Sequence, residues 1–284
     1  MGGGTWTTSS FVDYSKSVGR SVSKTGIVDS SYTAQDLFVS HKLQPELNPK
    51  NVMRECRDTE EHPNTVPVIL ALDVTGSMGK SAAEVAKKLN EVMTNLYERV
   101  TDVEFLIMAI GDLAYDDAPI QASQFESDIR IAEQLDQVYF EGGGGGNSYE
   151  SYTAAWYFGL HHTDLDCWKR GKKGILITLG DEPLNPYLPK EALQRVTGDS
   201  LQGDVDTKTL YAQASQKYDI YHLVITDGSG YRYYGDKLCE SWESVIDKDH
   251  CHTAGVDGVA GKIVEIVTHA TNETVGSTLH EISW

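Results

Sequence analysis

Four short, continuous apolar runs, separated by segments of other character, constrain the fold of this chain more than any other feature. The runs are Val66–Leu72, Val103–Ile110, Gly174–Leu179 and Asp219–Ile225. A continuous apolar run of this length is typical of a strand that is covered on both faces. Strands that alternate with helices predict an α/β fold, here a Rossmann-like three-layer sandwich with a mostly parallel central sheet and helices on both faces.

The segments between the runs have apolar residues at helical spacing or bear turn signals. Ser81–Val100 predicts one amphipathic helix, because its apolar residues recur every three or four positions with charged residues between them. The other expected elements, in chain order, are a helix at Phe125–Leu135, a strand at Val138–Phe140, one or two helices within Lys190–Lys217, a short strand at His250–Thr253 and a helix from Val256 to about Ala270.

Residues 1–65 differ from the rest of the chain. They are rich in Ser, Thr and Gly, show little periodicity and contain Pro45, Pro49 and Pro63 near their end. We therefore expect an N-terminal extension over residues 1–65, anchored on its own domain by scattered aromatic side chains. The α/β domain is expected at 66–272 and a C-terminal tail at 273–284.

The composition excludes several classes of function. Lys and Arg total 24 against 42 Asp and Glu, and the resulting formal charge of -18 opposes binding to nucleic acid or to an anionic membrane. No apolar run approaches the roughly 20 residues that span a bilayer, and no apolar signal core follows Met1. Four widely scattered cysteines indicate neither a disulfide framework nor a zinc ribbon. We expect a cytoplasmic protein with reduced thiols.

An aspartate lies at or just beyond the end of each predicted core strand. These residues are Asp73, Asp112, Asp181 and Asp227. In a parallel sheet, ligands bind at the carboxyl ends of the strands. A single aspartate in this position is more often a turn residue, but four together predict a site at this edge.

The loop after the first core strand has the most specific chemistry. Asp73, Thr75 and Ser77 offer one carboxylate and two hydroxyls at alternate positions of a tight turn. Hard cations such as Mg²⁺ select oxygen ligands of this kind. The loop therefore predicts a divalent metal site, with Mn²⁺ or Ca²⁺ as alternatives to Mg²⁺.

On these residues the chain resembles the von Willebrand factor A domain family. The first loop of the family's metal-ion-dependent adhesion site follows the pattern D-x-[ST]-x-S, which Asp73, Thr75 and Ser77 match, and Asp181 matches the aspartate of its third loop. The resemblance covers roughly residues 66–270. It implies a non-enzymatic, metal-dependent protein-interaction module whose cation captures an acidic residue of a partner, and a MoxR-type AAA+ ATPase as the partner.

Two positions of the resemblance stay open. The family's second loop supplies a threonine, whereas this chain has Gly142–Gly146 followed by Asn147, Ser148 and Glu150, any of which could substitute. For the third loop, Asp227 in Ile225-Thr-Asp-Gly is a second candidate. The order of elements along the chain favours Asp181, because its strand directly follows the helix that the glycine loop opens.

Three enzyme classes fit the same region less well. The segment from Gly76 to Ser81 follows a strand like a phosphate-binding loop, but Val74 stands where that motif needs glycine. Haloacid-dehalogenase-type phosphatases need a second aspartate where Thr75 stands, and a serine nucleophile elbow would need a different glycine spacing around Ser77. A magnesium-dependent phosphoryl hydrolase of the dehalogenase type remains the alternative function. A degenerate, purely structural domain is a third possibility.

An aromatic and basic segment follows the fourth core strand. It contains Tyr231, Arg232, Tyr233 and Tyr234, and we expect it to form an exposed loop near the strand tips that partners contact.

Overall fold

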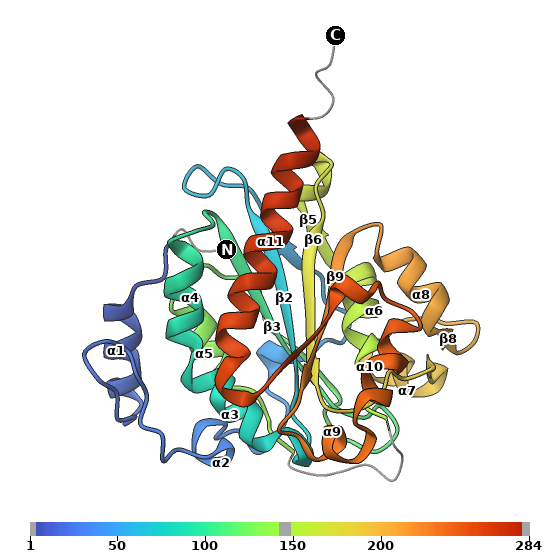
Figure 1. The fold of residues 1–284 in the computed structure, drawn as a ribbon, viewed down its shortest axis with the longest axis horizontal. Coiled ribbons are helices and arrows are strands. Elements are labelled where there is room, and N and C mark those ends of the chain that lie inside the picture. The colour runs from blue at the N-terminus through green and yellow to red at the C-terminus, as the bar shows by residue number, and fades with distance from the viewer. Residues whose placement is uncertain (1–3, 142–148, 280–284) are drawn as a thin grey trace.

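The computed structural model describes residues 4–141 and 149–279, apart from the side chains of Ser77 and of residues 272–279. Its centre is a six-stranded sheet, parallel except for β4, which runs antiparallel to β3 (Figure 1). The strands, in spatial order, are β10 (Cys251–Ala254), β9 (Tyr218–Ile225), β6 (Gly174–Gly180), β2 (Val66–Asp73), β3 (Val103–Ile110) and β4 (Ile120–Ala122).

Helices cover both faces of this sheet. On one face lie α3 (Gly79–Lys87), α4 (Leu89–Tyr97), α5 (Arg130–Asp136) and α11 (Val259–Leu279). On the other lie α6 (Thr153–His161), α7 (Lys190–Thr197), α8 (Thr207–Ala214) and α10 (Asp236–Glu243). The three-layer α/β fold expected from the sequence is confirmed.

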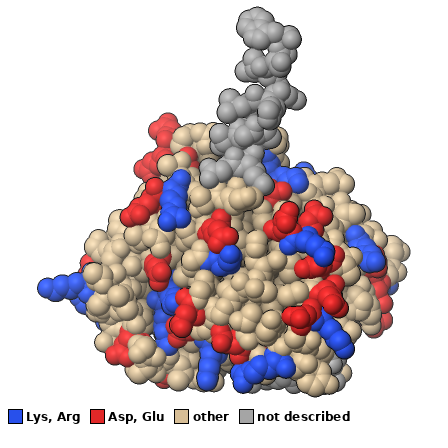
Figure 2. All heavy atoms as spheres, viewed as in Figure 1, with Lys and Arg blue, Asp and Glu red and all other residues tan. Residues whose placement is uncertain are grey.

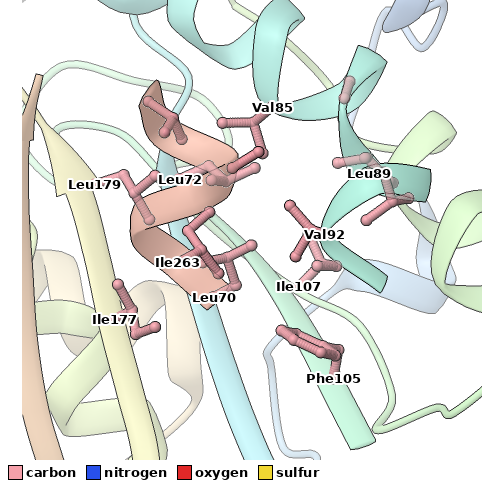
Figure 3. Close-up of a cluster of buried hydrophobic side chains, with 14 of the residues drawn as sticks. Leu70, Leu72, Val85, Leu89, Val92, Phe105, Ile107, Ile177, Leu179 and Ile263 are labelled. Atoms are coloured by element: carbon pink, nitrogen blue, oxygen red, sulfur yellow. The ribbon is translucent and has the colours of Figure 1, made fainter. Parts of the chain in front are cut away.

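The central strands are apolar throughout because both of their faces are covered. On β2, Leu70 and Leu72 point into the first core, and the alternate residue Ala71 belongs to the second. Figure 3 shows the first core, where Leu70 and Leu72 lie among side chains of α3, α4 and α11 such as Val85 and Ile263. Burial of each such side chain contributes roughly 1.5–3 kcal/mol, which fixes the strand ends in space.

The prediction of a single helix over Ser81–Val100 is wrong. The structure has two helices, α3 and α4, because the backbone at Lys88 leaves helical angles with φ -91° and ψ 3°. Both helices bury an apolar face against the same core, so the periodicity continues across the break. The Lys88 ammonium donates a hydrogen bond to the Asp257 carbonyl at the break, a contact that local spacing cannot reveal.

The region between β3 and α6 also differs from expectation. Within the described residues, no strand of more than one bridge forms at 138–140, where Tyr139 makes only an isolated bridge to Ser40. The helix expected from Phe125 begins at Arg130 instead, and Phe125 lies buried before it. The short strand β4 was missed because its three residues follow a polar loop and carry no usable periodicity.

Two later elements also differ in detail. The last helix was expected over Val256 to about Ala270, but α11 runs to Leu279, so the expected tail boundary at 273 falls inside it. Tyr231, Tyr233 and Tyr234 lie on a short helix, α9 (Ser229–Tyr234), rather than in a loop. The close packing of Gly230 against Asp181 fixes this turn of helix, and a tertiary contact of this kind is not visible in the sequence.

The N-terminal extension packs on the domain that follows it. It contains α1 (Thr8–Ser17), α2 (Ala34–Leu37) and β1 (Arg54–Cys56), and β1 pairs with β5 (Thr163–Leu165). The Trp6 side chain is buried and its indole N–H donates to Asn90 of α4 at 3.0 Å. Trp6 and Phe11 are part of the first core and thus anchor the extension on its own domain, as expected.

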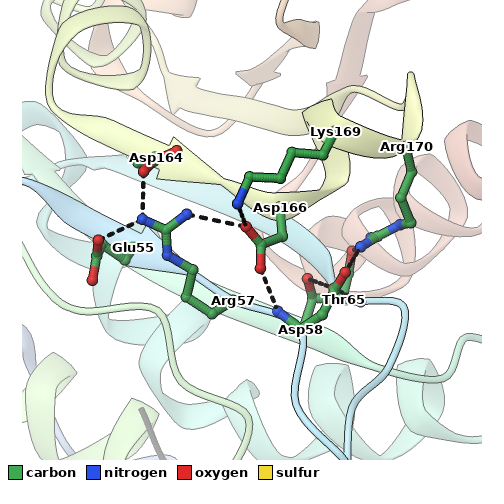
Figure 4. A network of polar contacts seen from close by, with 8 residues as sticks. All are labelled: Glu55, Arg57, Asp58, Thr65, Asp164, Asp166, Lys169 and Arg170. Atoms are coloured by element: carbon green, nitrogen blue, oxygen red, sulfur yellow. Dashed lines mark hydrogen bonds and ion pairs between the residues drawn. The ribbon is translucent and has the colours of Figure 1, made fainter.

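Charged side chains fasten the end of the extension to the sheet domain (Figure 4). Arg57 contacts the carboxylates of Glu55, Asp164 and Asp166, and Arg170 pairs with Asp58. These ion pairs join the segment before β2 to β5 and to the turn that follows it. A second small sheet, of β7 (Tyr187–Leu188) and β8 (Val205–Asp206), lies between β6 and α8 in the chain.

None of the helices in the described part of the chain combines the length and the apolar character that crossing a bilayer requires. The four cysteines are free thiols, two of them buried.

Candidate metal centre

The loop after β2 is built around the Asp73 carboxylate, which is completely buried. Its Oδ1 accepts hydrogen bonds from the Thr75 backbone N–H at 2.9 Å and from the Thr75 hydroxyl at 2.6 Å. This turn brings the carboxylate and the first hydroxyl of the predicted loop together. Ser77 lies in the 3₁₀ turn Gly76–Met78 that leads into α3, and its side chain is outside the described atoms.

A tyrosine that the sequence analysis did not single out completes this loop. The Tyr152 hydroxyl donates to Asp73 Oδ2 at 2.6 Å and accepts the Glu182 backbone N–H at 3.3 Å. Tyr152 is fully buried directly before α6, and thus joins the tip of β2 to the tip of β6. No local pattern identifies such a residue, because its partners lie 79 and 30 positions away in the chain.

The loop after β6 places Asp181 beside Asp73. The Asp181 carboxylate is completely buried and its Oδ2 accepts the Gly230 backbone N–H at 2.8 Å. A Cβ at Gly228 would overlap that carboxylate, and one at Gly230 would overlap the Asp181 carbonyl. Asp181 is therefore held by backbone that approaches closely because it has no side chains.

The rival candidate Asp227 has a different role. It is exposed, and its Oδ2 accepts the Val256 backbone N–H at 2.6 Å, which secures the turn before α11. Of the two candidates, Asp181 is the one whose charge acts on Asp73.

Glu150 enters the same region from the segment before α6. The neighbouring Ser151 donates its backbone N–H to the Gly111 carbonyl at 3.2 Å and accepts the Leu113 N–H on its hydroxyl at 3.0 Å. These bonds bracket Asp112 and bring Glu150 next to the tip of β3. Asn147 and Ser148, the other second-loop candidates, lie outside the described residues.

The gathered carboxylates disfavour one another's ionisation. Burial raises the pKa of Asp73 to about 7, and the Asp181 charge adds to the rise, while hydrogen bonds from Thr75 and Tyr152 oppose it. Burial likewise raises the pKa of Glu182 to about 7, with Asp181 and Asp73 contributing. Burial and then the Asp73 charge raise the pKa of Glu150. A nearby positive charge would therefore favour ionisation of this group of side chains.

Three carboxylate oxygens here are buried without a hydrogen-bond partner among the described residues. They are Asp112 Oδ2, Glu150 Oε2 and Glu182 Oε2. An unpartnered buried carboxylate oxygen carries a desolvation penalty of several kcal/mol. A divalent cation close to any one of these oxygens would supply a partner for it, and carboxylate oxygens are ligands that hard cations select.

The described residues do not form a complete metal site from acidic and nitrogen ligands alone. Within 4–141 and 149–279, no three or more His, Cys, Asp and Glu side chains are grouped so that they could hold a metal ion. The donor set expected here includes the hydroxyls of Thr75 and Ser77, which such a grouping does not contain.

A serine–histidine–aspartate arrangement lies elsewhere and has a structural role. His62 Nδ1 is 3.2 Å from Asp102 Oδ1, and Nε2 is 3.4 Å from the Ser127 hydroxyl. The Ser127 hydroxyl instead donates to the Gly4 carbonyl at 2.6 Å, and His62 Nε2 lies 3.0 Å from the same carbonyl. Ser127 is completely buried. The group therefore holds the start of the chain and is no hydrolytic triad.

Comparison with known proteins supports the fold of this chain but does not identify its family. No protein-family model and no curated protein matches the sequence. The chain is similar in structure to the pilus adhesin SpaC of Lactobacillus rhamnosus GG in its open conformation, with TM-score 0.52 and 14% identity over 78% of this chain and 31% of that one. A match to proximal thread matrix protein 1 of the mussel byssus has TM-score 0.48 and 10% identity over 73% of this chain and 48% of that one. The chain thus spans about a third of SpaC. At this identity the likeness to SpaC bears on the fold alone.

Proposed function

We propose that this chain is a von Willebrand factor A-type domain that binds one divalent cation and uses it to capture an acidic residue of a protein partner. The ligands are Asp73, Thr75, Ser77 and Asp181, and Mg²⁺ is the cation we favour over Mn²⁺ and Ca²⁺. A bound Mg²⁺ would offer a water-filled position that an incoming carboxylate can occupy. The chain's own residues orient the ligands and exclude bulk water.

One observation carries this proposal. Buried carboxylates from the tips of β2, β3 and β6 share one region, and oxygens of Asp112, Glu150 and Glu182 have no hydrogen-bond partner among the described residues. Of the second-loop candidates we favour Glu150, because it is buried and its Oε2 is one of these oxygens. Tyr152 supports the site because its hydroxyl donates a hydrogen bond to Asp73.

The resemblance suggests further properties that belong to the same proposal. A MoxR-type AAA+ ATPase is the partner we favour, and a cytoplasmic location agrees with such a partner. The charge of -18 makes the cation useful in a second way, since it offsets repulsion between this acidic chain and an acidic ligand.

Calorimetric titration of Mg²⁺ into chelator-stripped protein tests the proposal. We expect saturable binding by the wild type and a loss of at least about 100-fold in affinity for Asp73→Asn, since loss of even a supporting contact typically weakens metal binding by 10–100-fold. Asp227→Asn is the matched control, because it changes an exposed strand-tip aspartate by the same chemistry and should bind as the wild type does.

Two results would reject the proposal. One is the absence of both binding heat and a Mg²⁺-dependent rise in melting temperature for the wild type. The other is magnesium-dependent release of phosphate from generic phosphomonoesters that Asp73→Asn abolishes, which would support the phosphoryl hydrolase instead.

A further inference from the structure

Two cysteine thiols from different elements meet at one edge of the central sheet. Cys239 lies on α10 and Cys251 begins the edge strand β10, and the two side chains hydrogen-bond to each other. Both are free thiols and partly exposed, whereas Cys56 and Cys167 are buried. A disulfide needs two thiols that a small shift joins and an oxidant that reaches one of them. Cys239 and Cys251 meet both requirements.

This contact follows from the way α10 packs on the sheet. The helix lies against both β9 and β10 (Figure 1), and its Leu238 and Trp242 are buried in the second core. Cys239 and Cys251 pack against the same core. Burial of the large side chains thus fixes the two backbones that carry the thiols, and close packing keeps the thiols together.

Redox chemistry fits this pair of thiols better than metal binding does. Among the described residues, no third His, Cys, Asp or Glu joins Cys239 and Cys251 in a grouping that could hold a metal ion. Structural zinc sites use four protein ligands. Two partly exposed thiols in contact are, by contrast, the complete set of protein groups that a disulfide requires.

The two thiols differ in reactivity. Burial raises the pKa of the Cys251 thiol to about 12, and Cys239 and Glu243 add to the rise. Burial and the charges of Glu243 and Asp236 also raise the pKa of Cys239, but the hydrogen bond with Cys251 opposes that rise. Because the thiolate is the nucleophile, Cys239 attacks an oxidant first and Cys251 acts as the resolving thiol.

The charge of the protein favours an uncharged oxidant. The chain carries -18, and on the face that Figure 2 shows, Asp and Glu are interspersed with Lys and Arg. Glu243 and Asp236 place further negative charge beside the pair. Anionic disulfides of small thiols are repelled by these charges, whereas hydrogen peroxide is neutral and small enough to reach a partly exposed thiol.

We propose that Cys239 and Cys251 form a disulfide on oxidation by hydrogen peroxide and that this bond fixes α10 on β10. The Cys239 thiolate attacks one peroxide oxygen, the O–O bond breaks, and a sulfenic acid forms. The released hydroxide takes up the proton that the thiol lost. The Cys251 thiolate then attacks the Cys239 sulfur, the S–O bond breaks, and the second hydroxide leaves as water with the Cys251 proton. Two thiols thus lose two electrons and two protons, and one peroxide becomes two waters.

Helix α10 also contacts the loop that carries Asp181. The Trp242 indole N–H donates to the Glu182 carbonyl at 3.2 Å, and the Ser241 hydroxyl accepts the Leu184 backbone N–H at 3.0 Å. A disulfide in the same helix limits its motion away from the sheet, so these bonds to the loop open less often. Oxidation therefore stiffens the loop after β6, whether or not a metal binds there.

Peptide mapping tests the disulfide directly. Reduced protein is treated with hydrogen peroxide at pH 8, the remaining thiols are alkylated under denaturing conditions, and the monomer band of a non-reducing gel is digested with trypsin. Trypsin cleaves after Lys248, between the two cysteines. We expect peptides 238–248 and 249–262 to appear joined, two hydrogen masses below their sum, and Cys56 and Cys167 to be alkylated.

The oxidised protein should also differ in stability and dynamics. We expect a melting temperature about 5 °C above that of the reduced form, reversed by dithiothreitol, because the cross-link restricts the unfolded chain. Hydrogen exchange of the segment that contains Leu184 should be at least about threefold slower. The matched variants Cys239→Ser and Cys251→Ser should melt within about 2 °C of the reduced wild type and show neither change after peroxide treatment.

Three results would overturn the inference. Recovery of peptides 238–248 and 249–262 only as separate alkylated species excludes the disulfide. A sulfinic or sulfonic acid at Cys239 without the joined peptides shows that Cys251 does not resolve the sulfenic acid. Unchanged exchange at Leu184 in the joined form excludes the stiffening of the loop. None of these measurements uses Mg²⁺, so the inference and the proposed metal function stand or fall separately.

Discussion

At the scale of single residues, Tyr152 shows how the candidate centre is held. Its hydroxyl is the contact that satisfies Asp73 Oδ2, and the same oxygen atom receives the Glu182 N–H. A hydrogen bond to a buried charged group contributes more than one between neutral groups. Tyr152 therefore stabilises the ionised form of Asp73, which a metal ion requires.

Replacement of this tyrosine tests that role. We expect Tyr152→Phe to lower the free energy of unfolding by about 1.5–3 kcal/mol at pH 8 without metal, because it removes a charge-assisted bond to a buried carboxylate. Urea denaturation measures the change. Tyr233→Phe is the control, since Tyr233 is 83% exposed. An effect of Tyr152→Phe no larger than that of the control would contradict the assignment.

His222 is a second buried residue with a measurable consequence. It stacks on Trp242 with ring centroids 3.4 Å apart, and its Nδ1 lies 2.9 Å from the Thr178 hydroxyl. Burial lowers the pKa of His222 well below its usual 6.5. The unfolded chain therefore binds a proton near pH 6 that the folded chain does not, and stability falls as pH drops below about 6.5.

The variant His222→Phe keeps a flat ring against Trp242 and removes this titration. We expect the slope of unfolding free energy against pH, between pH 6.5 and 5, to become less positive by up to about 1.4 kcal/mol per pH unit. Urea denaturation at several pH values measures the slope. An unchanged slope would show that His222 already carries its proton in the folded protein.

At the scale of elements, the backbone at the start of α9 holds the Asp181 side chain. Gly228 and Gly230 approach Asp181 so closely that neither position leaves room for a Cβ. The Gly230 N–H then donates to the carboxylate. The placement of one candidate ligand thus depends on an element 47 to 49 positions further along the chain, as 228 - 181 and 230 - 181 give.

Replacement of Gly228 by alanine, which adds one methyl group, tests this contact. Gly228→Ala should displace the Asp181 carboxylate, lower the free energy of unfolding by about 1–3 kcal/mol through overpacking, and weaken Mg²⁺ binding by about tenfold. Gly203→Ala is the matched control, because a Cβ there meets no atom within 4 Å. Urea denaturation and calorimetry give the two readouts. Wild-type Mg²⁺ affinity in Gly228→Ala would show that this contact does not position Asp181 for the metal.

At the scale of the whole molecule, folding brings acidic groups together against their own repulsion. The pKa values of Asp73 and Glu182 rise to about 7 in the folded chain from ordinary values of 3.8 and 4.5. The folded state therefore binds more protons than the unfolded chain between about pH 4 and 7. The contribution of these groups to stability is greatest at low pH and is lost as pH rises through 7.

A bound cation should reverse this loss. We expect the rise in melting temperature on addition of 5 mM Mg²⁺, about the scale at which a weak site saturates, to be larger at pH 8 than at pH 5.5, because Mg²⁺ binds the ionised carboxylates. Differential scanning fluorimetry measures the rise. Asp73→Asn should remove it at both pH values. A rise that is independent of pH would mean that Mg²⁺ binds away from these carboxylates.

Local sequence patterns were sufficient to predict the layers of the fold and the first loop of the candidate centre. Continuous apolar runs require strands with two covered faces, and the short spacing from Asp73 to Thr75 requires a tight turn whose hydrogen bonds are local. Both properties depend on neighbours within a few positions. They are therefore legible without any knowledge of the tertiary structure.

Contacts between positions far apart in the chain determine which other residues join that loop. Tyr152 bonds to Asp73, and Glu150 joins the same buried region. The order of elements along the chain already favoured Asp181 over Asp227, and the charge of Asp181 does act on Asp73. The helix break at Lys88 and the packing of Trp6 on α4 likewise depend on the tertiary structure. These contacts join positions far apart in the chain. They depend on burial, on steric fit at glycine and on the pairing of buried charges, and none of these produces a periodic pattern in the sequence.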